Sequence, residues 1–420
     1  MKEKIIIIGA GVSGLVAAIN LEKAGFNSVI LDQSDRVGGR VKTDYREGYQ
    51  FDHGFQVLLT QYPAAKKYLN YNLLDLVEFD PGSCIFYHQK KYYIGDPSRK
   101  LSLLFPTLLA KIGNVADKLK ILKLSKALKK KSFDDIFLAP ETTTLVYLKE
   151  KGFSDEVIKK FFKPFFTGIF LESELTTSSR KFEFVYKMFA EGSAAIPKKG
   201  IQAIPNQLAA QLKNTELEFN TSVEHIKANE LVLTNGKTLA FDYCIIAAEA
   251  WPIIANLKNQ ESVWKSVETL YFRVKEKVIK KPLIGLIADE AALVNNIHYQ
   301  PIKKSDNYLL SVSVIKQHNL SKDELINRVE EDLATYCHIK VDSFVKYFKI
   351  KKALPVMHTV NFMMPPSETQ LKDRIFLAGD QLSNGSLNAA MLNGESAARA
   401  VIAKIKNGFI HVTYARRFTL

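Results

Sequence analysis

Uninterrupted runs of apolar residues predict buried strands near both ends of the chain. Residues 5–8 are four isoleucines in a row, and residues 375–377 form a similar apolar run. Runs without polar alternation are typical of strands that are buried on both faces of a parallel sheet. Residues 29–31 and 243–248 show the same pattern. We therefore expect an α/β fold (α+β over the whole chain) with a Rossmann-type sheet built from discontinuous segments.

Between these runs, polar and apolar positions follow other periods. Residues 309–314 alternate as a half-buried strand does. A strand pair formed by residues 216–219 and 231–233, with a turn at Asn235-Gly236, is also expected. Residues 66–197 are predicted to be largely helical. The remaining predictions are strands at 216–219, 231–233, 269–274, 308–315 and 343–350, and helices at 15–24, 208–212 and 322–337.

A glycine-rich turn follows the first strand. Gly9, Gly11 and Gly14 form a G-x-G-x-x-G pattern that opens a helix. This spacing permits a tight turn, a close approach of backbone to a pyrophosphate, and close packing of the helix on the strand. The helix N-terminus adds unpaired N–H groups and a partial positive charge. Asp32 ends the second strand, where an acid can accept hydrogen bonds from a ribose, so the segment predicts a dinucleotide site.

Two further motifs indicate which dinucleotide is bound. Residues 36–40 read R-V-G-G-R, and residues 374–391 combine Gly-Asp with the start of a small-residue helix. Together with the first motif they resemble the FAD-dependent amine oxidases, protoporphyrinogen oxidases and phytoene desaturases. The resemblance implies that Asp380 bonds the ribityl chain of FAD and that the helix after it points at the flavin N1–C2=O edge. A helix N-terminus there would stabilise the negative charge of reduced flavin.

The same resemblance implies a strand past the isoalloxazine ring at residues 51–59 and a backbone contact to adenine at Val223. We interpret His53, inside that strand, as a structural histidine. The full set of residues expected to bind FAD is Gly9, Gly11, Val12, Ser13, Gly14, Asp32, Gln33, Arg36, Gly38, Gly39, Arg40, Gly54, Phe55, Gln56, Val223, Gly379, Asp380, Leu387, Asn388 and Ala389.

The motifs also imply two interleaved domains, for which 420 residues provide enough chain. An FAD-binding domain is expected from residues 1–65, 198–262 and 355–410. A mixed helix and sheet substrate domain is expected from residues 66–197 and 263–354.

Cysteine usage and the N-terminus suggest the compartment. Cys84, Cys244 and Cys337 are scattered, so we expect no disulfide framework, no metal site and a reducing, cytoplasmic environment. None lies near the C-terminal glycines, where covalently flavinylated amine oxidases attach their cofactor, so non-covalent FAD is expected. The first strand begins at Ile5, so no signal peptide is expected, and no apolar run predicts a membrane span.

The net charge of +14 raises the question of an acidic partner. No nucleic-acid motif is present and basic residues do not interleave with aromatics, so nucleic-acid binding is not expected. Residues 101–131 repeat apolar side chains at helical spacing among many lysines. Such a segment is either a helix lying on an anionic membrane surface or a solvated helix packed on its own domain. The first alternative predicts a protein that is peripheral on the cytoplasmic membrane.

These motifs predict an oxidoreductase that removes two hydrogens from a small hydrophobic substrate, passes hydride to flavin N5 and is reoxidised by O₂ or a quinone. Residues 382–384 replace the aromatic pair of monoamine oxidases, and this favours a larger, apolar substrate. The aromatic residues at 161–166 either line the site or pack in the core. A flavin amine oxidase is the alternative, followed by a flavin-dependent isomerase or a non-catalytic FAD and lipid binder. Amine oxidases commonly place a lysine, through water, near flavin N5, and by its order after the strand at 269–274 the resemblance suggests Lys275 as the single catalytic candidate.

Overall fold

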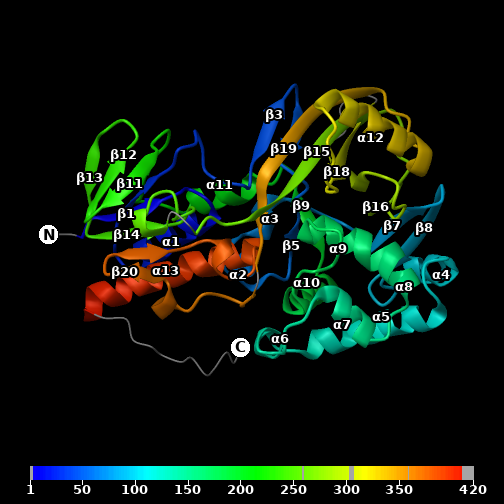
Figure 1. The fold of residues 1–420 in the computed structure, drawn as a ribbon, viewed down its shortest axis with the longest axis horizontal. Coiled ribbons are helices and arrows are strands. Elements are labelled where there is room, and N and C mark those ends of the chain that lie inside the picture. The colour runs from blue at the N-terminus through cyan, green and yellow to red at the C-terminus, as the bar shows by residue number, and fades with distance from the viewer. Residues whose placement is uncertain (1–2, 258–259, 302–306, 358, 409–420) are drawn as a thin grey trace.

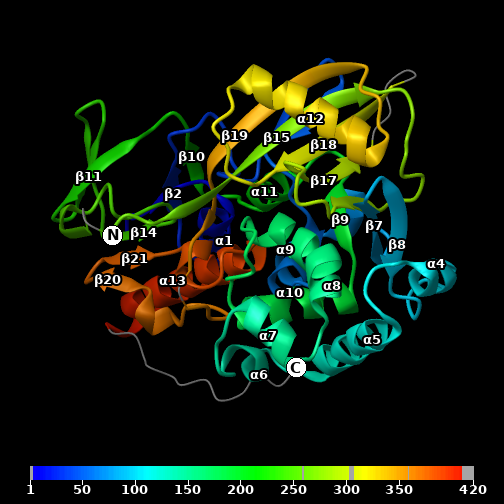
Figure 2. The same ribbon diagram turned by 45° about the vertical axis from the view of Figure 1, so that its right-hand side comes forward.

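The computed structural model describes residues 3–257, 260–301, 307–357 and 359–408, which form two lobes (Figure 1). One lobe contains the first strand, the glycine-rich turn and the last helix. The other contains a large sheet with helix α12 on one side and a layer of helices on the other (Figure 2).

A six-stranded sheet forms the centre of the first lobe. Its order is β10-β2-β1-β14-β21-β20, and all pairs are parallel except β21 with β20. β1 lies inside the sheet with all four isoleucines buried, as its apolar run predicts. The strands are β1 (Ile5–Ile8), β2 (Ser28–Leu31), β10 (Glu216–Glu218), β14 (Tyr243–Ile246), β20 (Gln370–Lys372) and β21 (Ile375–Leu377).

Two helices from opposite ends of the chain pack side by side on this sheet. They are α1 (Val12–Lys23), which follows β1, and α13 (Leu387–Asn407), which follows β21. Their contact is close because a Cβ on Gly394 would meet the backbone oxygen of Ser13 at 2.2 Å. The N-termini of both helices are therefore held near each other.

The predicted pairing of residues 216–219 with residues 231–233 is wrong. β10 lies parallel to β2, whereas β12 belongs to a separate antiparallel sheet. Parallel partners are not joined by a short turn, so closeness in sequence gives no sign of this pairing. The predicted turn at Asn235-Gly236 is confirmed between β12 and β13. The separate sheet contains β11 (Val223–Lys227), β12 (Glu230–Leu233) and β13 (Thr238–Ala240).

A seven-stranded sheet forms the second lobe, in the order β19-β15-β18-β17-β16-β7-β8. The strands predicted at 269–274, 308–315 and 343–350 lie in β15, β18 and β19, and the predicted helix is α12 (Lys322–Cys337), capped by Ser321. β16 and β17 were not predicted, and β7 and β8 come from the segment expected to be largely helical. The strands are β7 (Gly82–Tyr87), β8 (Lys90–Gly95), β15 (Trp264–Val274), β16 (Ile284–Ile287), β17 (Val294–Tyr299), β18 (Tyr308–Val314) and β19 (Ser343–Pro355).

The helical layer of the second lobe is organised around α10 (Ser179–Glu191), which α5, α6 and α7 contact. Phe162 and Phe166 of the aromatic segment are fully buried against Phe182 of α10, so most of this segment is core. The other helices are α4 (Leu104–Leu109), α5 (Val115–Lys130), α6 (Phe133–Phe137), α7 (Thr144–Glu150), α8 (Asp155–Val157) and α9 (Lys163–Phe170), with a π-helical turn at Ile158–Phe162.

The basic segment at 101–131 is two helices rather than one. Gly113, at φ +65°, separates α4 from α5, and Asn114 caps the second helix. The expected apolar face does not pack as a unit, since Ile112 is fully buried while Leu108 and Val115 are exposed. The periodicity carried across the break is therefore a coincidence of spacing.

The strand expected at 51–59 is interrupted. Residues 53–57 contain no strand, and Gly54 has φ +89°, so the chain turns between β4 and β5. The remaining elements are β3 (Thr43–Arg46), β4 (Tyr49–Asp52), β5 (Leu58–Leu59), β6 (Leu76–Glu78), β9 (Ala194–Pro197), α2 (Pro63–Tyr68), α3 (Tyr71–Leu74) and α11 (Ala203–Ala209). Throughout the described ranges, helices fall short of the length and apolarity that crossing a bilayer requires.

Candidate flavin and substrate site

A large cavity of about 740 Å³ lies between the two lobes. Its lining draws on the glycine-rich turn, the ends of β2, β14 and β21, the loop at 53–57 and, on the far side, α9, α10 and the seven-stranded sheet. The predicted site residues that line it are Gly9, Gly11, Val12, Ser13, Asp32, Gln33, Gly38, Gly39, Arg40, Gly54, Phe55, Gln56, Val223, Gly379, Asp380 and Leu387.

The turn from β1 to α1 leaves room for a ligand in one direction only. Cβ atoms on Gly9 and Gly14 would lie 2.9 Å and 2.0 Å from backbone oxygens, so both glycines serve packing. A Cβ on Gly11 would meet nothing closer than the Cα of Gly39, at 4.0 Å. No side chain caps the N-terminus of α1. Its N–H groups therefore remain available to an anion at the cavity wall.

Asp32 is held rigidly at the edge of the cavity. Its two carboxylate oxygens accept hydrogen bonds from the backbone N–H groups of Ala10 (2.6 Å) and Ser34 (2.7 Å). A carboxylate has about four lone-pair positions, so acceptor capacity remains for ribose hydroxyls. Thr221, Ser222 and Val223 line the same cavity.

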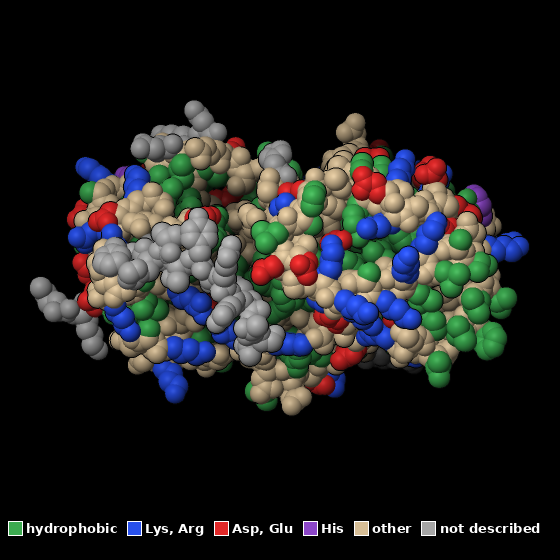
Figure 3. All heavy atoms as spheres, turned by 90° about the horizontal axis from the view of Figure 1, so that it is seen from below, with side chains coloured by type: hydrophobic (Ala, Val, Ile, Leu, Met, Phe, Trp, Pro, Cys, Tyr) green, Lys and Arg blue, Asp and Glu red, His purple; other side chains and the backbone are tan. Residues whose placement is uncertain are grey.

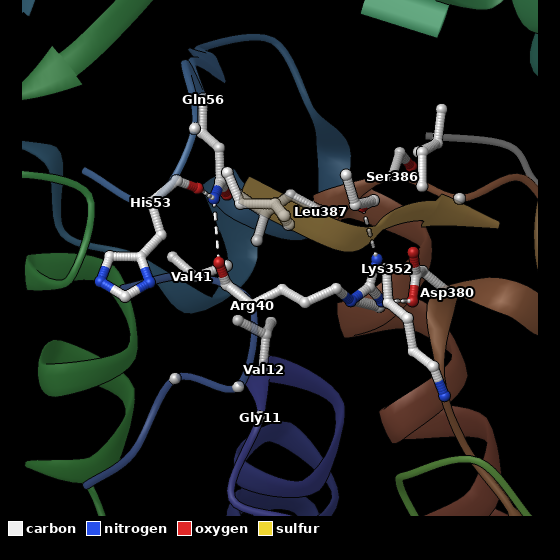
Figure 4. A pocket seen from close by; sticks show the side chains of 18 of the residues that line it. Gly11, Val12, Arg40, Val41, His53, Gln56, Lys352, Asp380, Ser386 and Leu387 are labelled. Carbon is white, nitrogen blue, oxygen red and sulfur yellow. Dashed lines mark hydrogen bonds and ion pairs between the residues drawn. The ribbon is translucent and has the colours of Figure 1, made fainter. Parts of the chain in front are cut away.

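Arg40 connects two motifs that are 340 residues apart. Its guanidinium forms an ion pair with Asp380, lies 5.0 Å from the ring centre of Trp264 and donates to the carbonyl of Ala353. Gln56 fixes the backbone of the same residue through a 2.9 Å bond to the Arg40 carbonyl (Figure 4). Sequence reasoning did not identify Trp264, because a lone tryptophan carries no positional signal.

The second helix N-terminus at the cavity is that of α13. Ser386 caps it by accepting a hydrogen bond from the N–H of Ala389, and Leu387 lines the cavity. Ala389 and Asn388 are buried and outside the lining. The Asn388 side chain faces the protein, where its oxygen accepts a bond from the N–H of Ala64.

Two predicted residues have other partners. Arg36 lies outside the cavity lining and forms a 2.7 Å ion pair with Asp44. Burial raises the pKa of Asp44, but the hydrogen bonds from Arg36 and His53 lower it by a larger amount. The pKa of Asp44 therefore lies below its ordinary value. His53 lies 3.1 Å from Asp44 and 4.3 Å from the ring of Phe348, which fits its structural interpretation, although it also lines the cavity.

The structure does not bring Lys275 to the site. Its side chain is 78% exposed, 4.0 Å from Asp342, and it is absent from the cavity lining. The reason is the length of β15: at a rise of about 3.3 Å per residue, Lys275 lies about 30 Å beyond Lys265. Lys265, at the near end of the strand, is bonded to the carbonyl of Phe170 (3.0 Å) and to Thr177.

Sequence reasoning did not anticipate the charged cavity residues Glu249, Lys352 and Lys181. Glu249 accepts hydrogen bonds from Trp264 and Lys352. Burial raises the pKa of Glu249, but the bond from Lys352 helps to hold that pKa below its ordinary value. Lys181, on α10, lines the cavity while being only 4% exposed. Each is one lysine or glutamate among many in the sequence, and only the fold gathers them.

The arrangement fits FAD. A long dinucleotide requires an anion site, a ribose acceptor and a second dipole for the flavin, and here α1, Asp32 and α13 provide them along one cavity. The open side of Gly11 is the position that any side chain would fill.

Comparison with known proteins agrees with this geometry. The family model described as flavin containing amine oxidoreductase matches residues 12–402. Polyamine oxidase 3 from Oryza sativa subsp. japonica is 26% identical over 291 residues, which cover 65% of this chain and 58% of that protein. The phytoene desaturase of Fusarium fujikuroi is 44% identical over 59 residues, 14% of this chain and 10% of that protein.

The fold matches solved structures over nearly its whole length. A provisionally assigned protoporphyrinogen oxidase from Exiguobacterium sp. 255-15 superimposes with a TM-score of 0.69 at 17% identity, covering 96% of this chain and 99% of the other. At that identity the likeness shows the fold alone. With the family model matched from residue 12 to residue 402, the chain belongs to the flavin-containing amine oxidoreductase family.

Proposed function

We propose that this oxidoreductase dehydrogenates a hydrophobic substrate rather than a cationic amine. The observation that carries the proposal is the state of the cavity's carboxylates. Among the described lining residues the acids are Asp32, Glu249 and Asp380. Glu249 and Asp380 are each paired with a cation, Lys352 and Arg40. Asp32 lies beside the glycine-rich turn, where its oxygens accept two backbone N–H groups and its remaining acceptor capacity is assigned to a ribose. A substrate ammonium group would need a free carboxylate, because an unpaired buried charge is expensive.

The substrate side of the cavity supports the same conclusion. Phe165 and Ile169 of α9 and Phe189 of α10 line it opposite the glycine-rich turn, together with Ile284 and Leu286 of β16. Apolar walls bind an apolar molecule through the area that they remove from water, about 25 cal/mol per Å². FAD, when bound, would supply the hydride acceptor, and these apolar side chains would hold the substrate. The protein's part is to orient the substrate and exclude water.

A flavin amine oxidase is the second proposal, because the match to rice polyamine oxidase covers 65% of this chain. Anaerobic mixing separates the two. We expect long-chain unsaturated compounds to bleach the flavin absorbance of the holoenzyme, and putrescine and spermine to leave it unchanged. Bleaching by the polyamines alone would replace the first proposal with the second. Reoxidation of the bleached protein by air or by a quinone then identifies the acceptor.

We also propose that FAD is bound without a covalent link. The three cysteines are buried, and none lines the cavity. Acid precipitation should release all of the flavin into the supernatant. Flavin that stays with the precipitate would overturn this part of the proposal.

A surface on the second lobe supports a peripheral membrane contact. Exposed apolar side chains gather on α4, its preceding turn and the start of α5 (Leu101, Leu104, Phe105, Leu108, Leu109, Val115 and Leu119), and we call this group the α4–α5 surface. Figure 3 shows hydrophobic side chains collected at the end of the molecule where α4 lies, with basic side chains (Lys and Arg, blue) beside them. Apolar side chains flanked by lysines favour an anionic bilayer surface.

Vesicle sedimentation tests the membrane contact. We expect binding to vesicles rich in phosphatidylglycerol that weakens with salt, and loss of binding in the double variant Phe105→Asp and Leu109→Asp. Leu138→Asp is the matched control, because Leu138 is 80% exposed and lies outside the α4–α5 surface. Equal binding by the wild type, the double variant and Leu138→Asp would contradict the membrane contact, as would equal binding to neutral and anionic vesicles. The remaining interpretation would be that α4 and α5 are solvated helices.

A further inference from the structure

Lys181 lies at one end of a row of side chains that α10 presents to the cavity. Lys181, Val185 and Phe189 all line the cavity, at i, i+4 and i+8 of one helix. At 1.5 Å per residue this row is about 12 Å long. It therefore combines a cation at one end with apolar side chains along the rest.

Lys181 differs from the other buried charges of the same helix. Glu183 is bonded to Lys131 and Tyr147, and Lys187 to two carbonyls and Glu191. Lys181 is 4% exposed, yet it makes no hydrogen bond or ion pair with any residue that the structure describes. Its Nζ lies 5.7 Å from the ring centre of Phe170, a contact much weaker than the hydrogen bonds and ion pairs of Glu183 and Lys187.

A buried lysine without a partner is destabilising, and an arriving anion removes that penalty. We propose that Lys181 binds the carboxylate of an amphipathic substrate acid, whose apolar chain lies along Val185 and Phe189. This inference rests on the proposed function and names its substrate class: a long-chain acid, oxidised in its hydrocarbon part.

The burial of Lys181 and the charges around it weaken its hold on a proton, which a bound anion would strengthen. Lys265 of β15 repels its charged form, while Asp380 and Glu172 favour it. Burial is the largest effect, and together these lower the pKa of Lys181 to about 7. A carboxylate alongside would raise that pKa again, because it favours the protonated amine. Binding of the acid above neutral pH must therefore take up a proton, and affinity must fall as pH rises.

The test compares oleate with oleyl alcohol, which share one chain, as ligands of the FAD-loaded protein, followed through the flavin absorbance. We expect oleate to bind about 10- to 100-fold more tightly than the alcohol at pH 7, the range for a charge-assisted hydrogen bond. The preference should shrink between about pH 7 and pH 9, while alcohol binding stays constant.

Two variants assign the effect to Lys181. Lys181→Met should remove the preference without weakening alcohol binding, and should raise the unfolding temperature, since it replaces an unpaired buried cation. Lys181→Arg should keep the preference. Phe189→Ala is the matched control, one that weakens oleate and alcohol binding by the same factor.

The outcomes distinguish two proposals: that Lys181 is the anchor of the substrate carboxylate, and that the substrate is hydrophobic. If Lys181→Met keeps the wild-type preference, or changes the FAD dissociation constant instead, the lysine does not hold a substrate carboxylate, and the apolar-substrate proposal stands. If the wild-type protein binds neither ligand, the proposed substrate class fails, and the anchor fails with it.

Discussion

At the residue scale, Asp52 carries a buried carboxylate whose titration should be visible in stability. Burial raises its pKa to about 6, although Thr43 and the N–H of Ile201 both donate to it. The folded state thus binds a proton more tightly than the unfolded state, and stability falls as pH rises from about 4 to about 6. Asp52→Asn keeps an acceptor oxygen for both donors, so it should stabilise the protein at pH 7.5 by about 1–3 kcal/mol.

Urea unfolding of both proteins at pH 4 and at pH 7.5 measures this difference. The gain of Asp52→Asn should be small at the lower pH, where the wild-type carboxyl is mostly protonated. A wild-type protein that is the more stable of the two at pH 7.5 would contradict the assignment.

Gly11 allows a second residue-scale prediction, on the cofactor. Its Cβ position is open toward the cavity, so Gly11→Val should fold but exclude the pyrophosphate. We expect a colourless protein with unchanged far-ultraviolet circular dichroism. The absorbance ratio of flavin to protein measures the outcome, and retention of yellow flavin at the wild-type ratio would contradict it.

At the element scale, the packing of α1 on α13 fixes the distance between the two helix N-termini. Gly394→Leu should push the helices apart, because its Cβ would meet the backbone of Ser13 rather than a side chain that can move. We expect a loss of about 1–3 kcal/mol of stability, typical of overpacking, together with weaker FAD binding. Lys406→Leu, on the exposed end of the same helix, should change neither. Denaturant midpoints and flavin titration measure both effects.

The elements also show what a sequence can and cannot predict. β1, β14 and β21 were predictable because strands buried on both faces need continuous apolar runs, and α12 because it has its own cap. The pairing of β10 with β2 was not predictable, since pairing between segments that are distant in sequence leaves no local pattern. Within the site, the glycines and Asp32 belong to motifs with fixed spacing. Lys181 could not be predicted, because it belongs to no motif with fixed spacing. It is distinguished by its burial without a partner among the described residues, which depends on how α10 packs in the folded protein.

At the scale of the whole molecule, the cavity is where the two lobes meet. Its lining includes Arg40 and Asp380 on one side and Phe189 and Ile284 on the other. A ligand that binds the folded protein but not the unfolded chain stabilises it by about 2.7 kcal/mol at a concentration of 100 Kd. FAD should therefore raise the unfolding temperature of the whole chain in a concentration-dependent way.

Thermal unfolding of the apoprotein with increasing FAD measures this effect. Asp380→Asn should shift the curve toward higher FAD concentration, because an amide pairs with Arg40 more weakly than a carboxylate does, in the part of the cavity that we propose binds FAD. Lys275→Ala should leave the curve unchanged, since that side chain is exposed and outside the lining. A cofactor that stabilised only one lobe would give two transitions, of which one stays fixed as FAD is added. A single transition that moves as a whole would mean that the lobes unfold together, with their shared cavity as the structural link.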